Sequence, residues 1–506
     1  MRQVLFPNNT GRIRNDNIYY MVLNEKKTGS FDDELNARNI ELEKQRKERQ
    51  NRSVEMTLNA IFERVQSRQA DIQVFISNMK RPEKALRGLL WNEIKYAADG
   101  NLLCTVYRER RKSEQRVIAY TGCCWEMIDQ QMWQHFVNRC SEKCGLPETY
   151  SKDPDFMEKT WRHTAFSVFE PRKHKVPDGE VWLNLQNGTL VIRRDGTPPE
   201  LRLHQREDMF FYVLPYYYNP EADCHGWLTY LDRVLPEKDS QTVLAEFVGY
   251  TLAKTHILNK MLWMVGPGAN GKSVALEIIE ALLGKSNVSN LSLSDLTNAP
   301  EKRVGMEGKL LNISTETGTN VRADVAKLLT AGEPVTVRHL YEDPFTTRDY
   351  GQFMAAFNVF PRPEITVAFQ RRLIVLPFDV IIPDEEQDKE LTQKLLKELS
   401  GILNWVIQAM PGLMERKAFT KSEVCQQALD QYFMQSDSVR MFYLEMCEKQ
   451  EYSTSGDELF KAYKTYCYDS NYTPLGKGNF YKRLDQHTHT REDIGRVVYF
   501  HLKLVS

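Results

Sequence analysis

Short apolar runs alternate with helical patterns through the middle of the chain. The run MLWMV (residues 261–265) is followed by a glycine-rich loop and then by KSVALEIIEALLG, whose apolar residues recur at helical spacing. Similar apolar runs follow at KLLNIS, QFMAAFN and RRLIVLPF. Apolar strands that alternate with helices are typical of a parallel sheet covered on both faces, so this part of the chain is predicted to be an α/β fold.

The segments before this region predict an α+β arrangement. Residues 33–70 indicate a solvated helix that leads into an amphipathic one. Two strands, a helix, a hairpin and two further helices are expected, in this order, in LLCTVYRE, QRVIAYTG, MIDQQMWQHFVNRCSEKCGL, EVWLNLQNGTLVIRR, CHGWLTYLDRVL and QTVLAEFVGYTLAKT. Within the hairpin, Asn187-Gly188 is the expected turn, because this pair favours the tight turns that join two strands.

The C-terminal part predicts helices in EEQDKELTQKLLKELSGILNWVIQAM. Two more helices follow, joined by a turn with Pro474 and Gly476, and then the strand RVVYFHLKLV. From these patterns we expect five parts, which are a charged helical region (1–84), an α+β domain (85–250), the α/β core (251–385), a helical connector (386–419) and a winged-helix-like module (420–506).

The composition limits the class of protein only loosely. A chain of 506 residues is long enough for about three or four domains. Its 67 Lys and Arg against 68 Asp and Glu give a net charge of -1, so nucleic-acid binding would need local basic surfaces. There is no apolar run of about 18 residues, and the N-terminus lacks the apolar core of a signal sequence. With nine cysteines and no such signal, we expect a cytoplasmic protein with reduced thiols and no membrane partner.

Two groups of residues allow more than one interpretation. Cys123, Cys124, Cys140 and Cys144 could bind zinc, but their spacing matches no standard zinc pattern, and structural thiols are expected instead. The acids of DPDF, Asp153 and Asp155, with His163 nearby, could hold metal for primer synthesis. However, Pro154 separates the acids, and their flanks predict a loop and a helix instead of a strand end. A separate primase is therefore the expected partner, and primer synthesis by this chain is the less favoured alternative.

The loop after MLWMV carries the strongest motif. It consists of Gly266, Pro267, Gly268, Ala269, Asn270, Gly271, Lys272 and Ser273, continues into the helix at Val274, and fits G-x-x-x-x-G-K-[ST]. Glycines let backbone N–H groups approach phosphate oxygens, and the N-terminus of the next helix favours the same negative charge. Lys272 is expected to reach the β- and γ-phosphates of a nucleoside triphosphate, and Ser273 to ligate Mg²⁺.

Three polar features follow the loop in a fixed order. Glu316 comes after KLLNIS, at the strand end where an α/β sheet binds its ligand, and is expected to help hold Mg²⁺ and to order the attacking water. Asn358 ends QFMAAFN and could orient that water or sense the γ-phosphate. Arg371 and Arg372 precede the last strand and could act on the nucleotide of a neighbouring subunit as arginine fingers.

This ordered set resembles the superfamily 3 helicases of the phage/plasmid primase-helicase family, which includes the poxvirus primase-helicase. The resemblance rests on GPGANGKS, STE, KLLTAGEPVTVRHLY, FNVFPRP and RRLIVLPF within about 250–385, and extends more loosely over about 115–506. It implies an AAA+-type P-loop NTPase core, followed by a winged-helix domain. Thr315 departs from the family pattern, because many members carry a second acid before the Walker B carboxylate. Mg²⁺ is therefore expected to be held mainly through Ser273 and water.

The resemblance implies an ATP-driven replicative DNA helicase of a phage, plasmid or mobile element, with ATP and Mg²⁺ as cofactors. Such a protein would assemble as a ring, expected to be a hexamer, and move 3′ to 5′ on single-stranded DNA to unwind forked duplex. Glu316 would be the Walker B carboxylate and catalytic base, Asn358 the polar sensor, and Arg371 or Arg372 the arginine finger. A combined primase-helicase and an origin-binding initiator that uses ATP only to assemble are the alternatives.

The DNA contacts are expected in two places. By the same resemblance, Lys327, Arg338 and His339 fall in the stretch that builds the pore hairpin, and PVTVRHLYEDPFTTRDY itself predicts a hairpin. In the C-terminal module, Lys477, Lys482 and Arg483 lie in the second helix, which is the usual DNA contact of a helix-turn-helix, and Arg491 and Arg496 add to this basic side. Docking of another protein is a nearly equal alternative for this module, since its charge is close to neutral.

Overall fold

The computed structural model describes most of the chain from residue 54 onward. The described residues are 54–67, 88, 92, 103–106, 116–128, 130–143, 152–167, 175–315, 321–338, 343–358, 367–470, 472 and 474–505. Several sequence-based expectations therefore lie outside them, namely the helix before Val54, and Cys144, Glu316 and His339. Among the described residues, no helix combines the length and the apolar character that crossing a bilayer requires.

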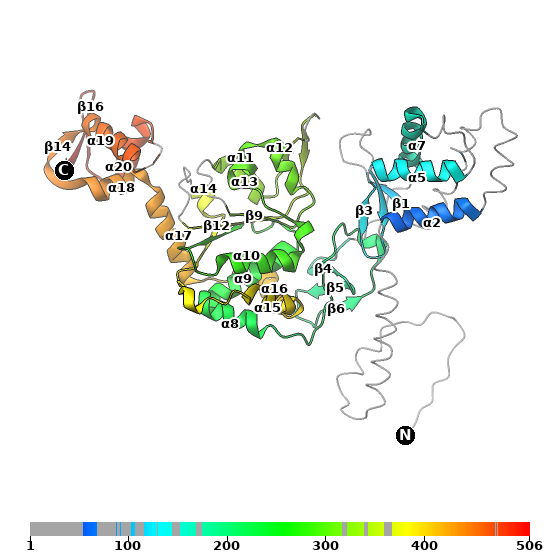
Figure 1. Ribbon diagram of the computed structural model, residues 1–506. Helices are drawn as coiled ribbons and strands as arrows, with labels where there is room; N and C mark the ends of the chain where they lie inside the picture. Colours follow the sequence, from blue (N-terminus) through cyan, green and yellow to red (C-terminus); the bar gives the residue numbers. More distant parts are fainter. Residues whose placement is uncertain are drawn as a thin grey trace, which may run out of the picture. The chain divides into compact units, whose positions relative to one another are not determined.

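A five-stranded sheet with only parallel pairings forms the centre of the fold, which confirms the predicted α/β class (Figure 1). Its spatial order is β13-β7-β12-β9-β8, so the last strand lies beside the first. The bounds are β7 (Met261–Val265), β8 (Val288–Ser289), β9 (Leu311–Ser314), β12 (Gln352–Phe357) and β13 (Leu373–Pro377). Each predicted apolar run thus forms a strand of one sheet.

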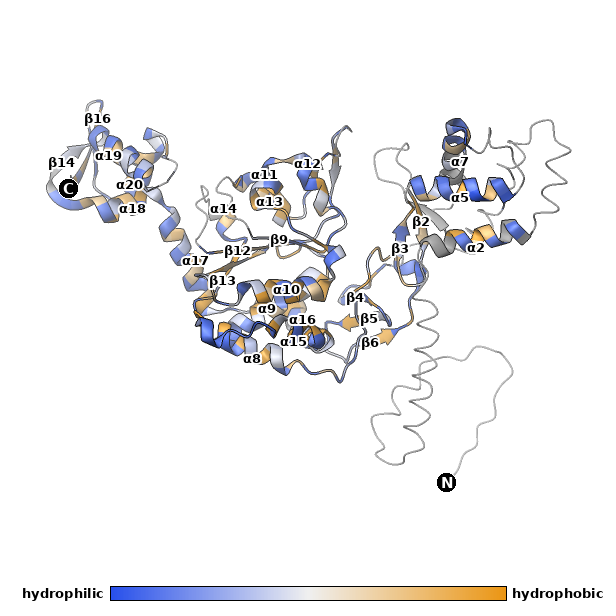
Figure 2. Cartoon of the chain, in the orientation of Figure 1, coloured by the Kyte–Doolittle hydropathy of each residue, from blue (hydrophilic) through white to orange (hydrophobic). Residues whose placement is uncertain are grey.

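Helices cover both faces of this sheet. Successive residues of each strand point to opposite sides, so the strands present apolar side chains on both faces. Leu262 and Met264 of β7 join one buried cluster, and Trp263 joins the other. The first face is covered by α8 (His225–Val234), α9 (Lys238–Leu252), α10 (Lys272–Leu283), α15 (Leu391–Leu395) and α16 (Leu399–Arg416). The second is covered by α11 (Leu293–Asn298), α12 (Pro300–Arg303), α13 (Ala323–Thr330), α14 (Val367–Gln370) and α17 (Glu423–Ser436). In Figure 2, apolar residues mark the sides of α9, α10 and α16 that pack together.

The core extends beyond the expected limits of 251–385. α9 continues across residue 250, and buried residues of α9 and α16 belong to the same cluster as the sheet. The predicted domain and connector on either side of 251–385 therefore each contribute helices to the packing of the sheet. The reason is physical: the sheet alone would leave one apolar face without cover.

The hairpin before the core forms as predicted, but its turn lies one residue earlier than expected. β4 (Glu180–Leu185) pairs with β5 (Gly188–Arg193), so that Gln186 and Asn187 are the turn residues and Gly188 already belongs to the strand. A third strand, β6 (Glu200–Arg202), pairs with β5 close to Gly188. A Cβ on Gly188 would lie 2.3 Å from the carbonyl oxygen of Arg202, so glycine is needed for close approach of the two strands.

The described N-terminal elements are three helices and a small antiparallel sheet. They are α2 (Val54–Ser67), β1 (Leu103–Val106), β2 (Arg116–Tyr120), β3 (Trp125–Met127), α5 (Gln130–Lys143) and α7 (Pro154–Ser167), and the predicted pairing of β1 with β2 is confirmed. The acids of DPDF begin α7: the amide of Asp155 donates to Asp153 Oδ1 (3.1 Å), and Lys159 pairs with Asp155 (2.8 Å). These acids start a helix, as their flanks predicted, instead of ending a strand.

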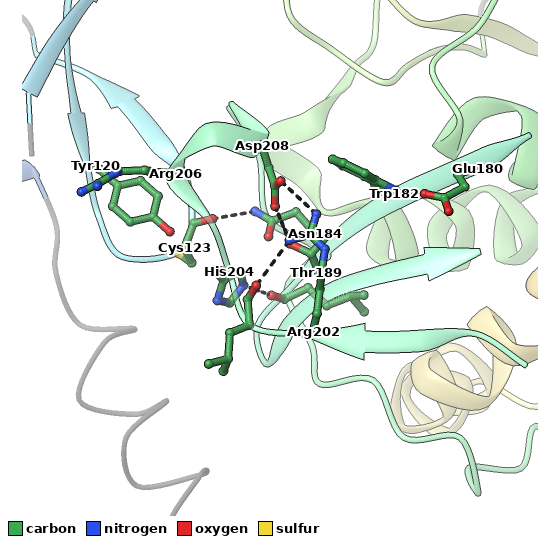
Figure 3. A network of polar contacts seen from close by, with 12 residues as sticks. Tyr120, Cys123, Glu180, Trp182, Asn184, Thr189, Arg202, His204, Arg206 and Asp208 are labelled. Atoms are coloured by element: carbon green, nitrogen blue, oxygen red, sulfur yellow. Dashed lines mark hydrogen bonds and ion pairs between the residues drawn. The ribbon is translucent and has the colours of Figure 1, made fainter. Parts of the chain in front are cut away.

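A polar network joins this small sheet to the β4–β6 hairpin (Figure 3). Asn184 Nδ2 donates to the carbonyl oxygens of Cys123 (3.0 Å) and Tyr212 (2.7 Å). The guanidinium of Arg202 donates to both oxygens of buried Asp208 (2.7 and 2.9 Å), which belongs to the short 3₁₀ helix η2 (Arg206–Asp208). Buried polar groups are costly unless each has a hydrogen-bond partner. These pairings therefore favour one arrangement of the hairpin against the segment that contains Cys123.

The C-terminal module combines three helices with a three-stranded antiparallel sheet of order β14-β16-β15. Its elements are α18 (Ser438–Met446), β14 (Cys447–Ser455), α19 (Gly456–Asp469), α20 (Lys477–Thr488), β15 (Arg491–Ile494) and β16 (Val497–Leu504). Buried Phe442, Tyr463 and Phe480 form its aromatic centre. The two predicted helices and the last strand are confirmed, and the assignment as a winged helix stays a prediction.

Candidate functional site

The glycine-rich loop leaves the carboxyl end of β7 and enters α10 at Lys272. β7 lies between β13 and β12, and the chain crosses from β7 to the far strand β8 before it returns. Ligands of open parallel sheets bind outside the carboxyl ends of the strands, at the point where the strand order reverses. The loop from Gly266 to Ser273 occupies that point.

The loop is anchored to the strands on both sides of it. The Gly266 amide donates to the carbonyl oxygen of Phe357 (3.2 Å), which ends β12, and Asn270 Nδ2 donates to that of Phe378 (2.6 Å), which follows β13. The amide of Ile382 donates to the Ala269 carbonyl oxygen (2.8 Å). A Cβ at Gly266 would lie only 2.1 Å from the Phe378 carbonyl oxygen, so this position requires glycine.

Lys272 is buried and folds back onto the loop. Its ammonium donates to the carbonyl oxygens of Gly266 (2.7 Å) and Pro267 (3.0 Å) and to Asn270 Oδ1 (3.0 Å), which accounts for its three protons. Burial lowers the pKa of Lys272 below its ordinary value. A partly desolvated ammonium held among neutral oxygens is favourably placed to exchange them for anionic ones.

The backbone around the loop fits a polyphosphate. Within the described part of the loop, the amides of Gly268, Ala269 and Gly271 have no protein acceptor, and a Cβ built on Gly268 meets no atom within 4 Å. The 12-residue helix α10 begins at the end of the loop and directs its positive N-terminus there. Ser273 is exposed in its first turn, where a hydroxyl could ligate Mg²⁺. The donor set is therefore suitable for a triphosphate with its metal.

Tyr230 of α8 contacts the last glycine of the loop, and no local sequence pattern predicted this contact. Its hydroxyl donates to the carbonyl oxygen of Gly271 (2.7 Å), and burial raises its pKa. Gly271 has a φ of 87°, a left-handed conformation that favours glycine, and a Cβ there would lie 2.9 Å from Val234. α8 thus fixes the conformation from which α10 starts.

Asn358, another predicted site residue, lies at the same edge of the sheet. Asn358 directly follows β12, one residue beyond the pairing of Phe357 with Val265, and is exposed. β9 ends at Ser314, which pairs with Ala355 of β12. Glu316 itself lies outside the described residues. The strand ends therefore bring Asn358 to the loop, and the strand that precedes Glu316 ends at the same edge.

Arg371 and Arg372 lie at the opposite edge. They precede β13, and the amide of Met261, the first residue of β7, donates to the Arg372 carbonyl oxygen (2.9 Å). Five residues of parallel strand separate this amino edge from the loop, a span of roughly 16 Å. The side chain of Arg371 is exposed. The structure does not bring these arginines to the loop of their own chain, so a role in hydrolysis would have to be exerted on another copy.

The predicted hairpin forms from β10 (Val335–Val337) and β11 (Phe345–Thr347), which pair antiparallel, and its role in a pore stays a prediction. Arg338 follows β10 and is exposed, whereas Lys327 is half-buried on α13. Buried Arg303 was missed by sequence reasoning. Its guanidinium donates to the carbonyl oxygens of Thr336 (2.7 Å) and Leu296 (2.6 Å), which fixes the base of the hairpin to α11 and α12.

Two of the three basic residues predicted to contact DNA in the C-terminal module are paired with acids. Lys477 pairs with Asp457, and Arg483 Nε donates to Asp437 Oδ2 (2.8 Å), while Lys482 is exposed. Of the two further basic residues, Arg491 pairs with Asp493 (3.0 Å). A phosphate would have to compete with these carboxylates, whereas Lys482 and Arg496 are exposed and have no carboxylate partner among the described residues.

Asp437 connects α17, α18 and α20, and we predict that its removal loosens the module. Its carboxylate caps α18 through the Val439 and Arg440 amides and accepts from Arg483 and His487 (2.7 Å). Burial alone would raise the pKa of Asp437, but these hydrogen bonds and the Arg483 charge hold it below its ordinary value of 3.8. The Asp437→Ala chain should lose about 1–3 kcal/mol of local stability at pH 7. That difference should shrink as the pH falls through the lowered pKa, since the carboxylate is then protonated.

Hydrogen exchange of the full chain, read on peptides of α18 and α20, measures this effect. Asp469→Ala, at the exposed end of α19, is the matched control. Equal exchange in the Asp437→Ala chain and the wild type at pH 7 would contradict the prediction.

The four cysteines considered for zinc are not gathered among the described residues. Cys123 Sγ and Cys124 Sγ lie 3.9 Å apart, and Cys140 is buried on α5. Within the described part of the chain, no group of three or more His, Cys, Asp or Glu residues is arranged to hold a metal ion.

Three segments of the chain match known protein families. Residues 113–236 match the D5 N terminal like family, residues 434–500 match the Poxvirus D5 protein-like family, and residues 264–372 match a family of unknown function, DUF5906. The last segment contains the loop and both arginines. Two solved apo structures of the NrS-1 C-terminal region each show 10% identity and a TM-score of 0.43. They cover 82% and 81% of this chain, and 99% and 98% of their own chains. The two D5-like segments on either side of the core support a relationship of this chain to the D5-like primase-helicases that its motifs resemble.

Proposed function

We propose that this protein is an ATP-driven DNA helicase that works in replication as a ring, with a hexamer as the expected form. The observation that carries the proposal is the anchored loop from Gly266 to Ser273, at the reversal point of a parallel sheet, with Lys272 held in it. The D5-like segments support a role in DNA replication. Movement from 3′ to 5′ on single-stranded DNA follows from the family resemblance alone.

Each site residue has a role in this proposal. The loop amides and Lys272 hold the β- and γ-phosphates, and Ser273 holds Mg²⁺ with help from water. Glu316 takes a proton from the attacking water, Asn358 orients that water, and an arginine of the adjacent copy stabilises charge on the leaving phosphates. When bound, Mg²⁺ would offset negative charge on the phosphates, and hydrolysis of ATP would release the free energy for movement. The location of Asn358 beside the loop and of Arg371 away from it supports this division between two subunits.

The DNA-binding roles are carried over from the sequence-based predictions, in which His339 follows Arg338 between the two hairpin strands. Arg338 and His339 on the β10–β11 hairpin would contact one strand in the ring, and Lys482 on α20 would contact duplex or forked DNA. Because Arg303 ties the hairpin base to α11 and α12, a shift of those helices would move the hairpin. This connection is the proposed path from hydrolysis to movement along DNA.

Two other functions are compatible with the same motifs. A combined primase-helicase would need a metal-binding acid pair, and Asp153 and Asp155 instead begin α7 with Lys159 paired to one of them. This observation favours a separate primase. An origin-binding initiator that uses ATP only to assemble predicts the same fold, so it must be distinguished by experiment.

Replacing Glu316 with Gln separates the motor from the initiator. The amide cannot accept the proton of the attacking water, so unwinding of a forked duplex should fall by about 100-fold or more, while ATP still binds and rings still form. Strand displacement of a labelled fork and particle mass with ATP are the two measurements. Glu221→Gln, an exposed change in the segment before α8, is the control.

Full unwinding by the Glu316→Gln chain would exclude Glu316 as the base. Wild-type chains that bind origin DNA and assemble with ATP, but never separate a fork, would favour the initiator.

A further inference from the structure

Two surfaces at opposite edges of the parallel sheet carry opposite charge. The first, which we name the acidic segment, is residues 379–390. It follows β13 and carries six acids (Asp379, Asp384, Glu385, Glu386, Asp388 and Glu390) against one lysine (Lys389). Residues 383–390 are all exposed. The amide of Ile382 donates to the Ala269 carbonyl oxygen (2.8 Å), so this segment flanks the proposed nucleotide loop.

Some of these acids are already paired within the chain. Glu386 pairs with Arg233, and Asp388 pairs with Lys394 (2.6 Å). Glu390 interacts with Lys394 through its charge, and Asp379 and Glu385 have no basic partner among the described residues. The segment therefore keeps a net negative charge after its internal pairs are formed.

The second surface, which we name the basic edge, consists of Ile257, Lys260, Arg371 and Arg372. The Lys260 ammonium donates to the Arg371 carbonyl oxygen (2.7 Å), which fixes the two residues together and leaves the lysine charge without a carboxylate in that bond. Nearby, Lys254 pairs with Asp349, and the negative charge of Glu333 favours the charged form of Arg372. The residues named at this edge therefore include four basic side chains and two acids.

An exposed isoleucine accompanies each surface. Among the described residues from 175 to 436, the large apolar side chains with the highest exposure are Ile257 (73%) and Ile381 (61%). Ile257 lies in the loop that leads to Lys260. Ile381 is the third residue of the acidic segment and lies next to Ile382, whose amide contacts the nucleotide loop. A large apolar side chain within a charged surface is typical of a contact whose centre is apolar and whose rim is polar.

We propose that the acidic segment of one copy binds the basic edge of a second copy of this chain. The contact is head-to-tail, because the two surfaces lie at opposite edges of one sheet, and such contacts generate closed rings or open filaments. It places Ile381 of one copy near Ile257 of the next and sets Glu385 opposite Lys260. This proposal rests on the proposed function for one step: the contact carries Arg371 and Arg372 to the loop of the adjacent copy.

Reversal of charge tests the contact in the full chain. Lys260→Glu and Glu385→Lys should each raise the apparent dissociation constant of the assembly by about tenfold or more, because like charges then face each other. The chain with both changes should return to within about threefold of the wild type, since every contact again holds one charge of each sign. Glu221→Lys, an exposed change on neither surface, is the matched control. Mass photometry with Mg²⁺ and a non-hydrolysable ATP analogue, without DNA, gives the dissociation constants.

The outcomes separate this proposal from the proposed function. Single reversals that leave assembly unchanged, a double change that fails to restore it, or a wild type that stays monomeric with nucleotide would each overturn the contact. Rings that depend on both surfaces but never unwind DNA would support the contact and overturn the helicase. Ile257→Ser and Ile381→Ser, which change no charge, should also weaken assembly, and circular dichroism of each chain checks that it is folded.

Discussion

Replacement of Lys272 by Ala should reduce DNA-stimulated ATP hydrolysis by about 100- to 1000-fold, which is the range seen when one preorganised donor to developing charge is removed. The ammonium is the group in the loop that carries a full positive charge, and it is held 2.7–3.0 Å from three loop oxygens. Nucleotide affinity should fall as well, because the phosphates lose that charge. Phosphate release and binding of a fluorescent ATP analogue are the two measurements.

Two further variants make this result specific. Lys285→Ala removes an exposed lysine just after α10 and should leave hydrolysis unchanged. Lys272→Arg keeps the charge but changes its shape, and should restore little activity, since the three oxygens are arranged around a compact ammonium. Hydrolysis at the wild-type rate by the Lys272→Ala chain would exclude the loop as the nucleotide site.

The chain with both Arg371→Ala and Arg372→Ala should lose hydrolysis by about 1000-fold, within the range that arginine fingers contribute. Its own loop stays complete, because these arginines lie at the far edge of the sheet. Mixing it with the Lys272→Ala chain, inactive by itself, should restore part of the activity. Some interfaces would then combine an intact loop from one chain with intact arginines from the other. Phosphate release as a function of the mixing ratio measures this effect.

Arg194→Ala, at the exposed end of the hairpin, is the control for loss of an arginine. If the double variant hydrolyses ATP at the wild-type rate, or if mixing restores nothing while mixed assemblies form, the arginines do not act across an interface.

The sequence predicted the strands and helices of the core well because each has a strong local pattern. β7, β12 and β13 are continuous apolar runs, and α10 follows a glycine loop with helical spacing. The order of the strands could not be predicted in this way. That β13 lies beside β7, and thus holds Arg371 and Arg372 at the amino edge, depends on contacts between segments more than a hundred residues apart.

The details that the sequence missed all depend on partners distant in the chain. The hairpin turn consists of Gln186-Asn187 instead of Asn187-Gly188, and Gly188 lies in a strand against Arg202 of β6, a neighbour that no local pattern includes. Arg483 was predicted as a DNA contact from its place on a helix, whereas its carboxylate partner Asp437 precedes it by 46 residues. A local pattern predicts which residues form a helix or a strand. Contacts between residues distant in the sequence depend on how these elements pack.

The resting contacts of Lys272 set a threshold for what the loop can accept. A ligand must outcompete Gly266, Pro267 and Asn270 for the same ammonium, so it gains only the difference between two sets of hydrogen bonds. An anion that offers a single contact has little to gain from this exchange. A chain of phosphates can contact the ammonium, the loop amides and the start of α10 together. Its additional hydrogen bonds then offset the loss of the resting ones. We therefore expect the loop to bind a triphosphate in preference to a single phosphate.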